Sequence, residues 1–287
     1  MFIFRKAKAY KMLSVGDLVK KSQPALFWCM HGISKPKREA LFTLFAFCRH
    51  IDALAHSAMP IKEKQELIKA WREELVNIYE KNVPATNIGR KIYKNCLRFN
   101  LPQQKWAEIL ECAVLNVPKP LKAPERIIFE QYLDSSAVIP FELALKIISG
   151  KNSVANSELA KDLGRAIMIT LILRDVKDDA KAGRLYLPKD ILKQAEIASF
   201  EPLQAVEDTN FAYARQLLAG EAALAFLKAD RLLNKLPKKD TFALRYVKNT
   251  CSYLFDTMQK RGWEIISPKP RLNIYNRLRI LLRTFFK

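Results

Sequence analysis

Three carboxylates follow one another closely at the end of an apolar segment. Within LILRDVKDDAKAGRLYLP, residues 171–188, the apolar run ends at Arg174 and is followed by Asp175, Asp178 and Asp179. Residues three and four positions apart share one face of a helix, so these side chains are expected to converge. Carboxylate oxygens are preferred ligands of hard cations, and carboxylates this close repel one another unless a cation neutralises them. The segment therefore predicts a Mg2+ site.

A second, weaker cluster closes the apolar segment ALFTLFAFCRHIDALAH at residues 40–56. It consists of Arg49, Asp52 and His56, of which the last two share a helical face. Acidic patches on two helices can clamp a diphosphate through bridging Mg2+ ions, while arginines bind the remaining oxygens. Both clusters have an alternative interpretation as solvated charges at helix ends, which contribute little on their own.

The elements that position these residues are predicted to be helices. Apolar residues recur at helical spacing along most of the chain, only 8 glycines are present, and most of the 14 prolines fall between the periodic segments. The fold class is therefore predicted to be all-α, with eight or nine helices in a single domain. The expected helices span residues 36–57, 61–80, 86–98, 103–116, 124–149, 155–181, 205–235 and 239–262.

Two of the predicted segments are apolar on nearly every side, AVIPFELALKIIS at 137–149 and LGRAIMITLILR at 163–174. A helix of this kind is buried by its neighbours. Both are therefore expected at the centre of the domain, with the amphipathic helices packed around them. Pro140 lies inside the first segment and is expected to kink its helix.

The composition excludes several classes of protein. With 49% hydrophobic and 27% charged residues, the chain is globular rather than disordered. Its 49 basic and 29 acidic residues give a net charge of +20, which favours an anionic partner: nucleic acid, an anionic membrane or a phosphorylated substrate. The lysines are scattered and not interleaved with aromatic residues, so nucleic-acid binding is disfavoured. No apolar run reaches about 18 residues, so we expect a cytoplasmic protein.

The last segment, PKPRLNIYNRLRILLRTFFK at 268–287, is basic and contains no acidic residue. If it is helical, most of its apolar side chains share one face and Arg279 and Arg283 lie opposite, which is typical of helices on an anionic membrane surface. The chain is therefore predicted to consist of a helical domain at 1–267 and this tail. The tail predicts peripheral attachment to the inner face of the membrane. The alternative is a last helix packed on its own domain.

The stretch DVKDDAKAGRLYLP at 175–188 resembles the second aspartate-rich motif of squalene and phytoene synthases, and KPKREALFTLFAFCRHIDALAH at 35–56 resembles their first motif region. YVKNTCSYLFDTMQKRGW at 246–263 is similar to the closing helix of that family, in particular of its bacterial presqualene-diphosphate-synthase-like members. The resemblance implies an all-α isoprenoid synthase fold around a central cavity. It also implies a prenyltransferase that uses Mg2+ to join two prenyl diphosphates of the farnesyl type head to head, by way of a cyclopropylcarbinyl diphosphate. NADPH as a further cofactor is left open.

Position by position, the resemblance implies roles for seven residues. It implies that Asp52, Asp175 and Asp179 are metal ligands and that Arg49, Arg174 and Arg184 bind diphosphate. Tyr132 matches the tyrosine of the family's YxxxVAGxVG segment, and the resemblance implies that it acts in catalysis together with Asp175 and Asp179.

The motifs also depart from the family pattern. His56 stands where the first motif, usually DxxxD, has its second aspartate, and Met168 and Leu171 stand where polar residues commonly precede the second motif. Each change removes an oxygen ligand or a hydrogen-bonding group. Two hypotheses follow: a prenyltransferase of isoprenoid biosynthesis, or a catalytically degenerate homologue that acts as a membrane-associated lipid-binding or respiratory-complex assembly factor.

Overall fold

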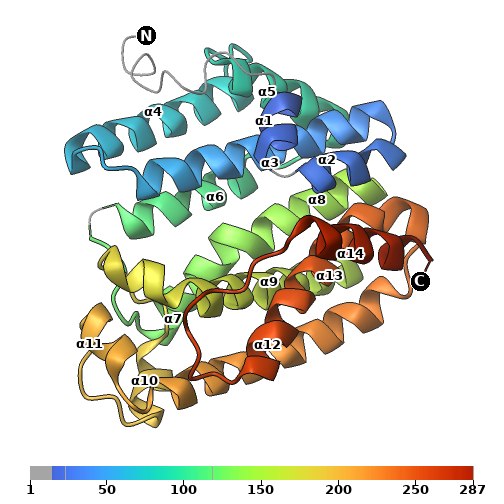
Figure 1. Cartoon of the computed structure of the whole chain (residues 1–287). Helices are drawn as coiled ribbons and strands as arrows, with labels where there is room; N and C mark the ends of the chain where they lie inside the picture. The colour runs from blue at the N-terminus through green and yellow to red at the C-terminus, as the bar shows by residue number, and fades with distance from the viewer. Residues whose placement is uncertain (1–14, 23, 118, 287) are drawn as a thin grey trace.

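The computed structural model of the protein describes residues 15–22, 24–117 and 119–286. Over these ranges the chain forms α-helices joined by short turns and contains no β-strand (Figure 1). One isolated parallel β-bridge joins Lys122 to Leu185. The predicted all-α fold class is confirmed.

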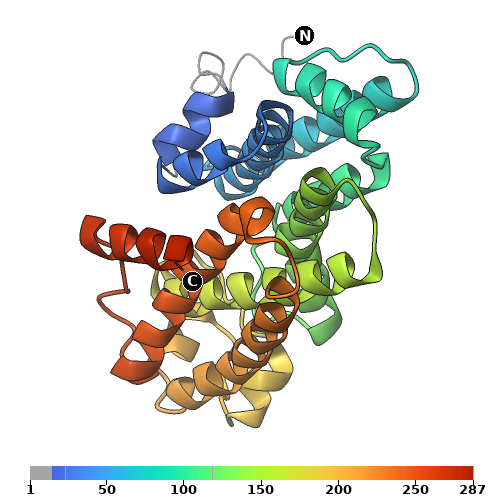
Figure 2. The same cartoon turned by 90° about the vertical axis from the view of Figure 1, so that its right-hand side faces the viewer.

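The N-terminal helices form one layer of the molecule (Figure 2). At its centre α3 packs against α1, α5 and α6. The ring of Phe47 on α3 meets the rings of Trp71 and Trp106 edge-on, at centroid distances of 5.2 and 5.3 Å. The layer comprises α1 (Val15–Ser22), α2 (Pro24–Cys29), α3 (Lys35–His56), α4 (Ile61–Tyr79), α5 (Asn87–Phe99) and α6 (Gln103–Asn116).

The second layer is built around α9, which packs against α8, α12 and α13. Leu163, Ile169 and Leu173 of α9 are fully buried, as expected for a helix that is apolar on nearly every side. The layer comprises α7 (Arg126–Leu133), α8 (Ile139–Ser149), α9 (Val154–Lys181), α10 (Lys189–Gln194), α11 (Pro202–Glu207), α12 (Phe211–Leu233), α13 (Lys238–Arg261) and α14 (Ile274–Phe286).

The helix expected over 124–149 is observed as a continuous helical run from Arg126 to Ser149, in which the π-helical turn η4 (Asp134–Val138) separates α7 from α8. The N–H of Ile139 bonds to the carbonyl of Asp134, five residues back. Pro140 then falls in the first turn of α8, directly after this π-helical turn. The proline is therefore accommodated by a wide turn directly before it.

The prediction of one helix over 205–235 is wrong, because α11 ends at Glu207 and α12 begins at Phe211. The Asp208 carboxylate accepts a hydrogen bond from the N–H of Asn210 at 2.8 Å. This local side-chain bond competes with continuation of the helix and explains the break.

Gly164 allows α9 to approach η4 closely. A Cβ atom at this position would lie 2.8 Å from the N atom and 2.9 Å from the Cα atom of Val138, both of which are backbone atoms that cannot rotate away. We expect Gly164→Ala to lower the free energy of unfolding by about 1–3 kcal/mol in urea denaturation. Gly220→Ala is the matched control, because Gly220 lies in α12 with no heavy atom within 4 Å of its Cβ position. That change should stabilise the protein by about 0.5–1 kcal/mol, and equal effects of the two substitutions would refute this explanation.

Candidate active site

The second aspartate cluster lies on the last turns of α9, where the buried face of the helix ends at Val176 and Ala180. Asp175 is paired with Arg174, whose Nε and Nη2 atoms lie 3.0 and 2.5 Å from its two carboxylate oxygens. Asp179 accepts hydrogen bonds from Nε and Nη2 of Arg184 at 3.1 and 3.0 Å. The structure thus brings together four of the seven predicted site residues.

A cation from the C-terminal part of the chain joins this cluster. Nζ of Lys269 lies 2.8 Å from Oδ1 of Asp175 and 2.5 Å from Oδ2 of Asp178. Spacing along the chain does not predict this contact, since more than 90 residues separate Lys269 from the aspartates. Its only signal was the excess of basic residues in the tail, which does not specify a partner.

The aspartates of the cluster differ in their pKa values. Burial raises the pKa of Asp175, but hydrogen bonds from Arg174 and Lys269 outweigh it and hold this pKa below its ordinary value. The hydrogen bond and charge of Lys269 lower the pKa of Asp178, which is 57% exposed. For Asp179, burial outweighs the contribution of Arg184 and raises the pKa. Asp179 is therefore the carboxylate of this cluster whose ionised form would gain most from a further positive charge nearby.

The first cluster lies at the end of α3. Nη1 of Arg49 lies 3.1 Å from Oδ2 of Asp52, and Nδ1 of His56 lies 3.1 Å from Oδ1 of the same carboxylate. Burial raises the pKa of Asp52, but the hydrogen bond and charge of His56, with the charges of Arg49 and Arg184, bring it below its ordinary value. Because Arg184 belongs to the other cluster, the two clusters act on each other electrostatically.

His56 connects the two layers. Its Nε2 atom lies 3.0 Å from the hydroxyl of Tyr186, which follows Arg184 in the turn after α9. The Tyr186 hydroxyl donates to Oδ1 of Asn116 on α6 at 3.1 Å. The residue that replaces the second aspartate of the first motif is thus a hydrogen-bonding partner of the second motif's turn. Spacing alone indicated neither Tyr186 nor Asn116.

Tyr132, the predicted catalytic tyrosine, lies beneath this connection. Its ring stacks on that of Tyr186 with centroids 4.8 Å apart and an interplanar angle of 14°. It is 3% exposed, and burial raises the pKa of its hydroxyl well above the ordinary value. The hydroxyl therefore keeps its proton at neutral pH.

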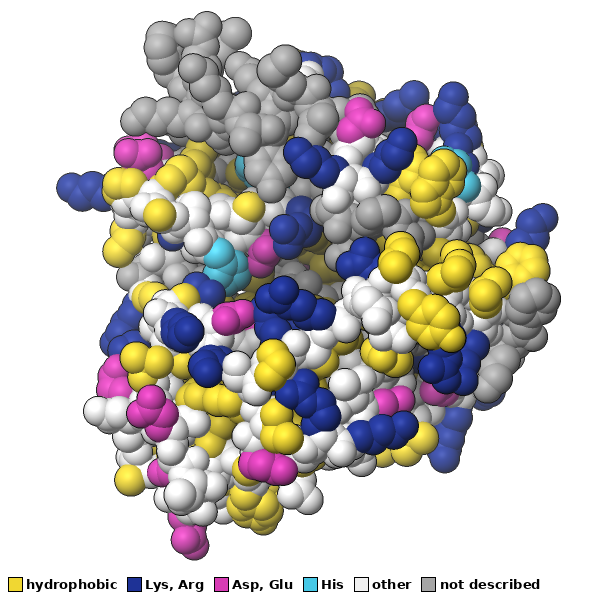
Figure 3. Space-filling model, viewed as in Figure 1, with side chains coloured by type: hydrophobic (Ala, Val, Ile, Leu, Met, Phe, Trp, Pro, Cys, Tyr) yellow, Lys and Arg dark blue, Asp and Glu magenta, His cyan; other side chains and the backbone are white. Residues whose placement is uncertain are grey.

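Acidic, basic and histidine side chains gather around a hollow near the middle of the face in Figure 3. Beside Asp179 and Arg184 lies a crevice too narrow to admit a water molecule, and Ile172, Val176 and Leu187 are among the apolar side chains that line it. Across the ranges that the structure describes, no three His, Cys, Asp or Glu side chains are arranged to hold a metal ion together. Basic side chains pair with the carboxylates instead. The chemistry of the carboxylates fits Mg2+, because they offer several hard oxygen ligands. The basic side chains beside them are the cationic groups that a diphosphate requires.

Comparison with known proteins identifies the family. Residues 19–277 match the family model described as squalene/phytoene synthase. The chain belongs to the squalene/phytoene synthase family. It is 27% identical over 260 residues to a presqualene diphosphate synthase of Rhodopseudomonas palustris, covering 90% of this chain and 92% of that one. Over 64% of this chain and 59% of the relative, it is 31% identical to a phytoene synthase of Mycobacterium tuberculosis.

Solved structures share the fold of this family member. A dehydrosqualene synthase in complex with ligand superposes with a TM-score of 0.81 at 20% identity, covering 99% of this chain and 96% of that one. The squalene synthase HpnC from Alicyclobacillus acidocaldarius gives 0.76 at 18% identity, covering 87% and 93%. Both aspartate clusters lie within the residues matched to the family model. The roles expected for the site residues stay predictions.

Proposed function

We propose that the protein joins two prenyl diphosphates of the farnesyl type head to head, with Mg2+-assisted release of diphosphate, to give a presqualene- or phytoene-type product. The observation that carries the proposal is that two carboxylate–arginine pairs lie on different helices. One is Asp52 with Arg49 on α3, and the other is Asp175 with Arg174 at the end of α9. His56 and Tyr186 hold these two sets near one another. Membership of the squalene/phytoene synthase family supports the same reaction.

Each site residue has a role in this proposal. Asp52, Asp175 and Asp179 would hold Mg2+, which when bound neutralises charge on the departing diphosphate. The three arginines bind diphosphate oxygens through directed N–H groups; they are Arg49, Arg174 and Arg184. Tyr132 holds its proton at Oη and offers a positioned hydroxyl to the reacting carbon chain. The apolar side chains beside Asp179, which include Ile172, Val176 and Leu187, would exclude water. Water would otherwise capture the carbocation that forms when diphosphate departs.

The test is incubation of purified protein with labelled farnesyl diphosphate and Mg2+, with and without NADPH. We expect Mg2+-dependent release of diphosphate and a cyclopropylcarbinyl diphosphate in the absence of NADPH. A hydrocarbon formed only with NADPH would add a reductive step to the proposal. Absence of diphosphate release from both farnesyl and geranylgeranyl diphosphate, with protein shown to be folded, would overturn it.

A second candidate function rests on the residues that differ from the family pattern. Met168 and Leu171 on α9 are partly buried apolar side chains packed against the core, and neither offers an oxygen to a metal or diphosphate. They favour a degenerate homologue that binds lipid or assists assembly of a respiratory complex. Membrane association without turnover of either prenyl diphosphate would support this candidate over the first.

We also propose that α14 attaches the protein peripherally to an anionic membrane surface. Its apolar residues Ile274, Tyr275, Leu278, Leu282 and Phe285 are exposed, whereas Ile280 and Thr284 are buried, and Asn249 of α13 donates to Thr284 at 2.9 Å. None of the helices described is both long enough and apolar enough to cross a bilayer. The test is co-sedimentation with vesicles: binding to phosphatidylglycerol-containing but not to pure phosphatidylcholine vesicles is expected, and binding to neither would refute the proposal.

A further inference from the structure

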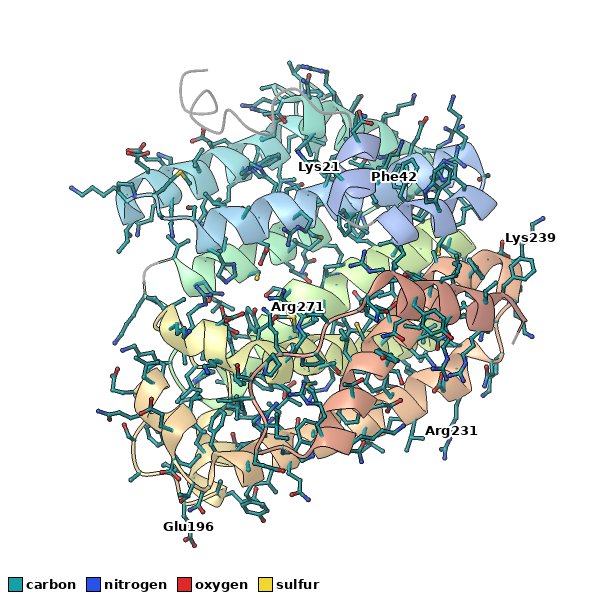
Figure 4. The ribbon with its side chains drawn as sticks, viewed as in Figure 1. Lys21, Phe42, Glu196, Arg231, Lys239 and Arg271 are labelled. Carbon is teal, nitrogen blue, oxygen red and sulfur yellow. The ribbon has the colours of Figure 1, made fainter. Side chains whose placement is uncertain are left out.

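The connection between α13 and α14 crosses the candidate active site. We call residues 262–273 the strap. It leaves the end of α13, runs in front of α9 and reaches α14 on the same face of the molecule (Figure 1). Arg271, labelled in Figure 4, lies on the part of the strap that passes over α9. The strap is thus placed where it can influence access to the aspartates of α9.

Both ends of the strap are anchored. At its start, the buried guanidinium of Arg215 donates to the carbonyl of Trp263 and lies 5.4 Å from the centre of that residue's ring. At its far end, α14 is held on α13 by the bond between Asn249 and Thr284. The middle of the strap is tied to α9 differently, through the ion pairs of Lys269.

Lys269 contacts two carboxylates of the second aspartate cluster, and one of them, Asp175, is a metal ligand of the proposed function. Its ammonium bridges Oδ1 of Asp175 and Oδ2 of Asp178, and its side chain is 30% exposed. Mg2+ needs oxygen ligands at about 2.1 Å, and an ammonium that is hydrogen-bonded to the same oxygen takes up one of its lone pairs and weakens it as a metal ligand. Two cations sharing these carboxylates would also repel each other strongly in this half-buried place. The ammonium and a divalent ion therefore compete for these carboxylates.

We propose that Lys269 is a tethered counterion of the second aspartate cluster, and that it competes with divalent metal for Asp175 and Asp178. Metal loading then requires the ammonium to leave, which frees the middle of the strap from α9. The strap closes over the cluster when Lys269 is bound and opens when metal is bound. This inference rests on the metal site of the proposed function and describes how that site is regulated.

The first measurement is the affinity for Mn2+ in the absence of substrate. The concentration of free Mn2+ is monitored by electron paramagnetic resonance. Lys269→Gln removes the competing charge, and we expect it to bind Mn2+ at least about tenfold more tightly than the unaltered protein. Lys269→Arg keeps the charge and should retain the weaker affinity. Lys260→Gln is the matched control, because Lys260 is an exposed lysine on α13 and its removal changes the net charge equally.

The second measurement follows the strap itself by limited trypsin digestion at the bond between Arg271 and Leu272. Lys269 precedes Pro270, and trypsin cleaves such bonds poorly, so Lys269→Gln leaves the set of cleavable bonds essentially unchanged. Mn2+ should accelerate cleavage after Arg271 in the unaltered protein. In Lys269→Gln, cleavage should be fast with or without Mn2+. Cleavage that is slow and independent of Mn2+ in both proteins would overturn the proposal.

Asp175→Asn separates failure of this inference from failure of the metal site. If Asp175→Asn weakens Mn2+ binding while Lys269→Gln and Lys260→Gln bind Mn2+ equally, the site stands and the counterion role is refuted. If Mn2+ affinity is the same in Asp175→Asn as in the unaltered protein, the metal site itself is refuted and the inference falls with it. Thermal unfolding of each variant verifies that affinities are compared between folded proteins.

Discussion

Asp175→Asn is expected to lower the rate of diphosphate release by about 10²–10³, because it removes a charge that stabilises the departing group through the metal. Asparagine has nearly the same size as aspartate, so packing at the end of α9 should be retained. The amide would face the cations of Arg174 and Lys269, which both contact Asp175. The measurement is kcat for diphosphate release at saturating prenyl diphosphate and Mg2+.

Asp162→Asn is the matched control for this prediction, because Asp162 lies on the same helix at the end remote from the cluster. Burial raises the pKa of Asp162, so a neutral side chain is tolerated there. Its kcat should stay within about twofold of the unaltered value. If Asp175→Asn keeps more than a third of the activity while remaining folded, the assignment of Asp175 as a metal ligand is wrong.

Arg215→Met should have the largest effect on stability. Arg215 of α12 is 1% exposed and donates to the carbonyls of Leu173 and Trp263, the former at 3.0 Å. Burial lowers the pKa of its guanidinium to about 10, so it stays charged at neutral pH. Methionine fills much of the space but leaves both carbonyls without this donor. We expect the free energy of unfolding to fall by about 2–4 kcal/mol in urea denaturation.

Arg231→Met tests whether this effect comes from burial and not from the loss of charge. Arg231 lies on the same helix but is exposed to solvent (Figure 4). Its replacement should change the free energy of unfolding by less than about 0.5 kcal/mol. Similar losses in the two variants would mean that Arg215 contributes through net charge and not through its carbonyl partners.

The helices and the local part of the site could be predicted from the sequence. The repeat of apolar residues specifies which face of a helix is buried, so α3, α6 and α9 begin and end within a residue of the ranges expected for them. The convergence of Asp175, Asp178 and Asp179 near one another follows from their spacing on one helical face. The π-helical turn within the helix at 124–149 could not be predicted, because a π-helical turn and an α-helical turn present similar apolar patterns.

Contacts between distant segments were beyond the reach of periodicity. Lys269 meets the aspartates of α9 because the strap is anchored at Trp263 and at α14, and no spacing within the sequence encodes those anchors. From its position in the first motif, His56 is predicted only to be a lost metal ligand. Its partner Tyr186 is 130 residues away and is brought near by the packing of the two layers.

The bond from His56 to Tyr186, continued to Asn116, fastens α3 and α6 to the turn after α9. In a DxxxD motif a carboxylate at this position would be available to join these elements through a bound ion. Here the fastening is made of atoms that belong to the polypeptide, so a chelator leaves it untouched. The spacing between α3, α6 and the turn after α9 is therefore set before any substrate or ion arrives, and part of the ordering that binding would otherwise require is complete in advance.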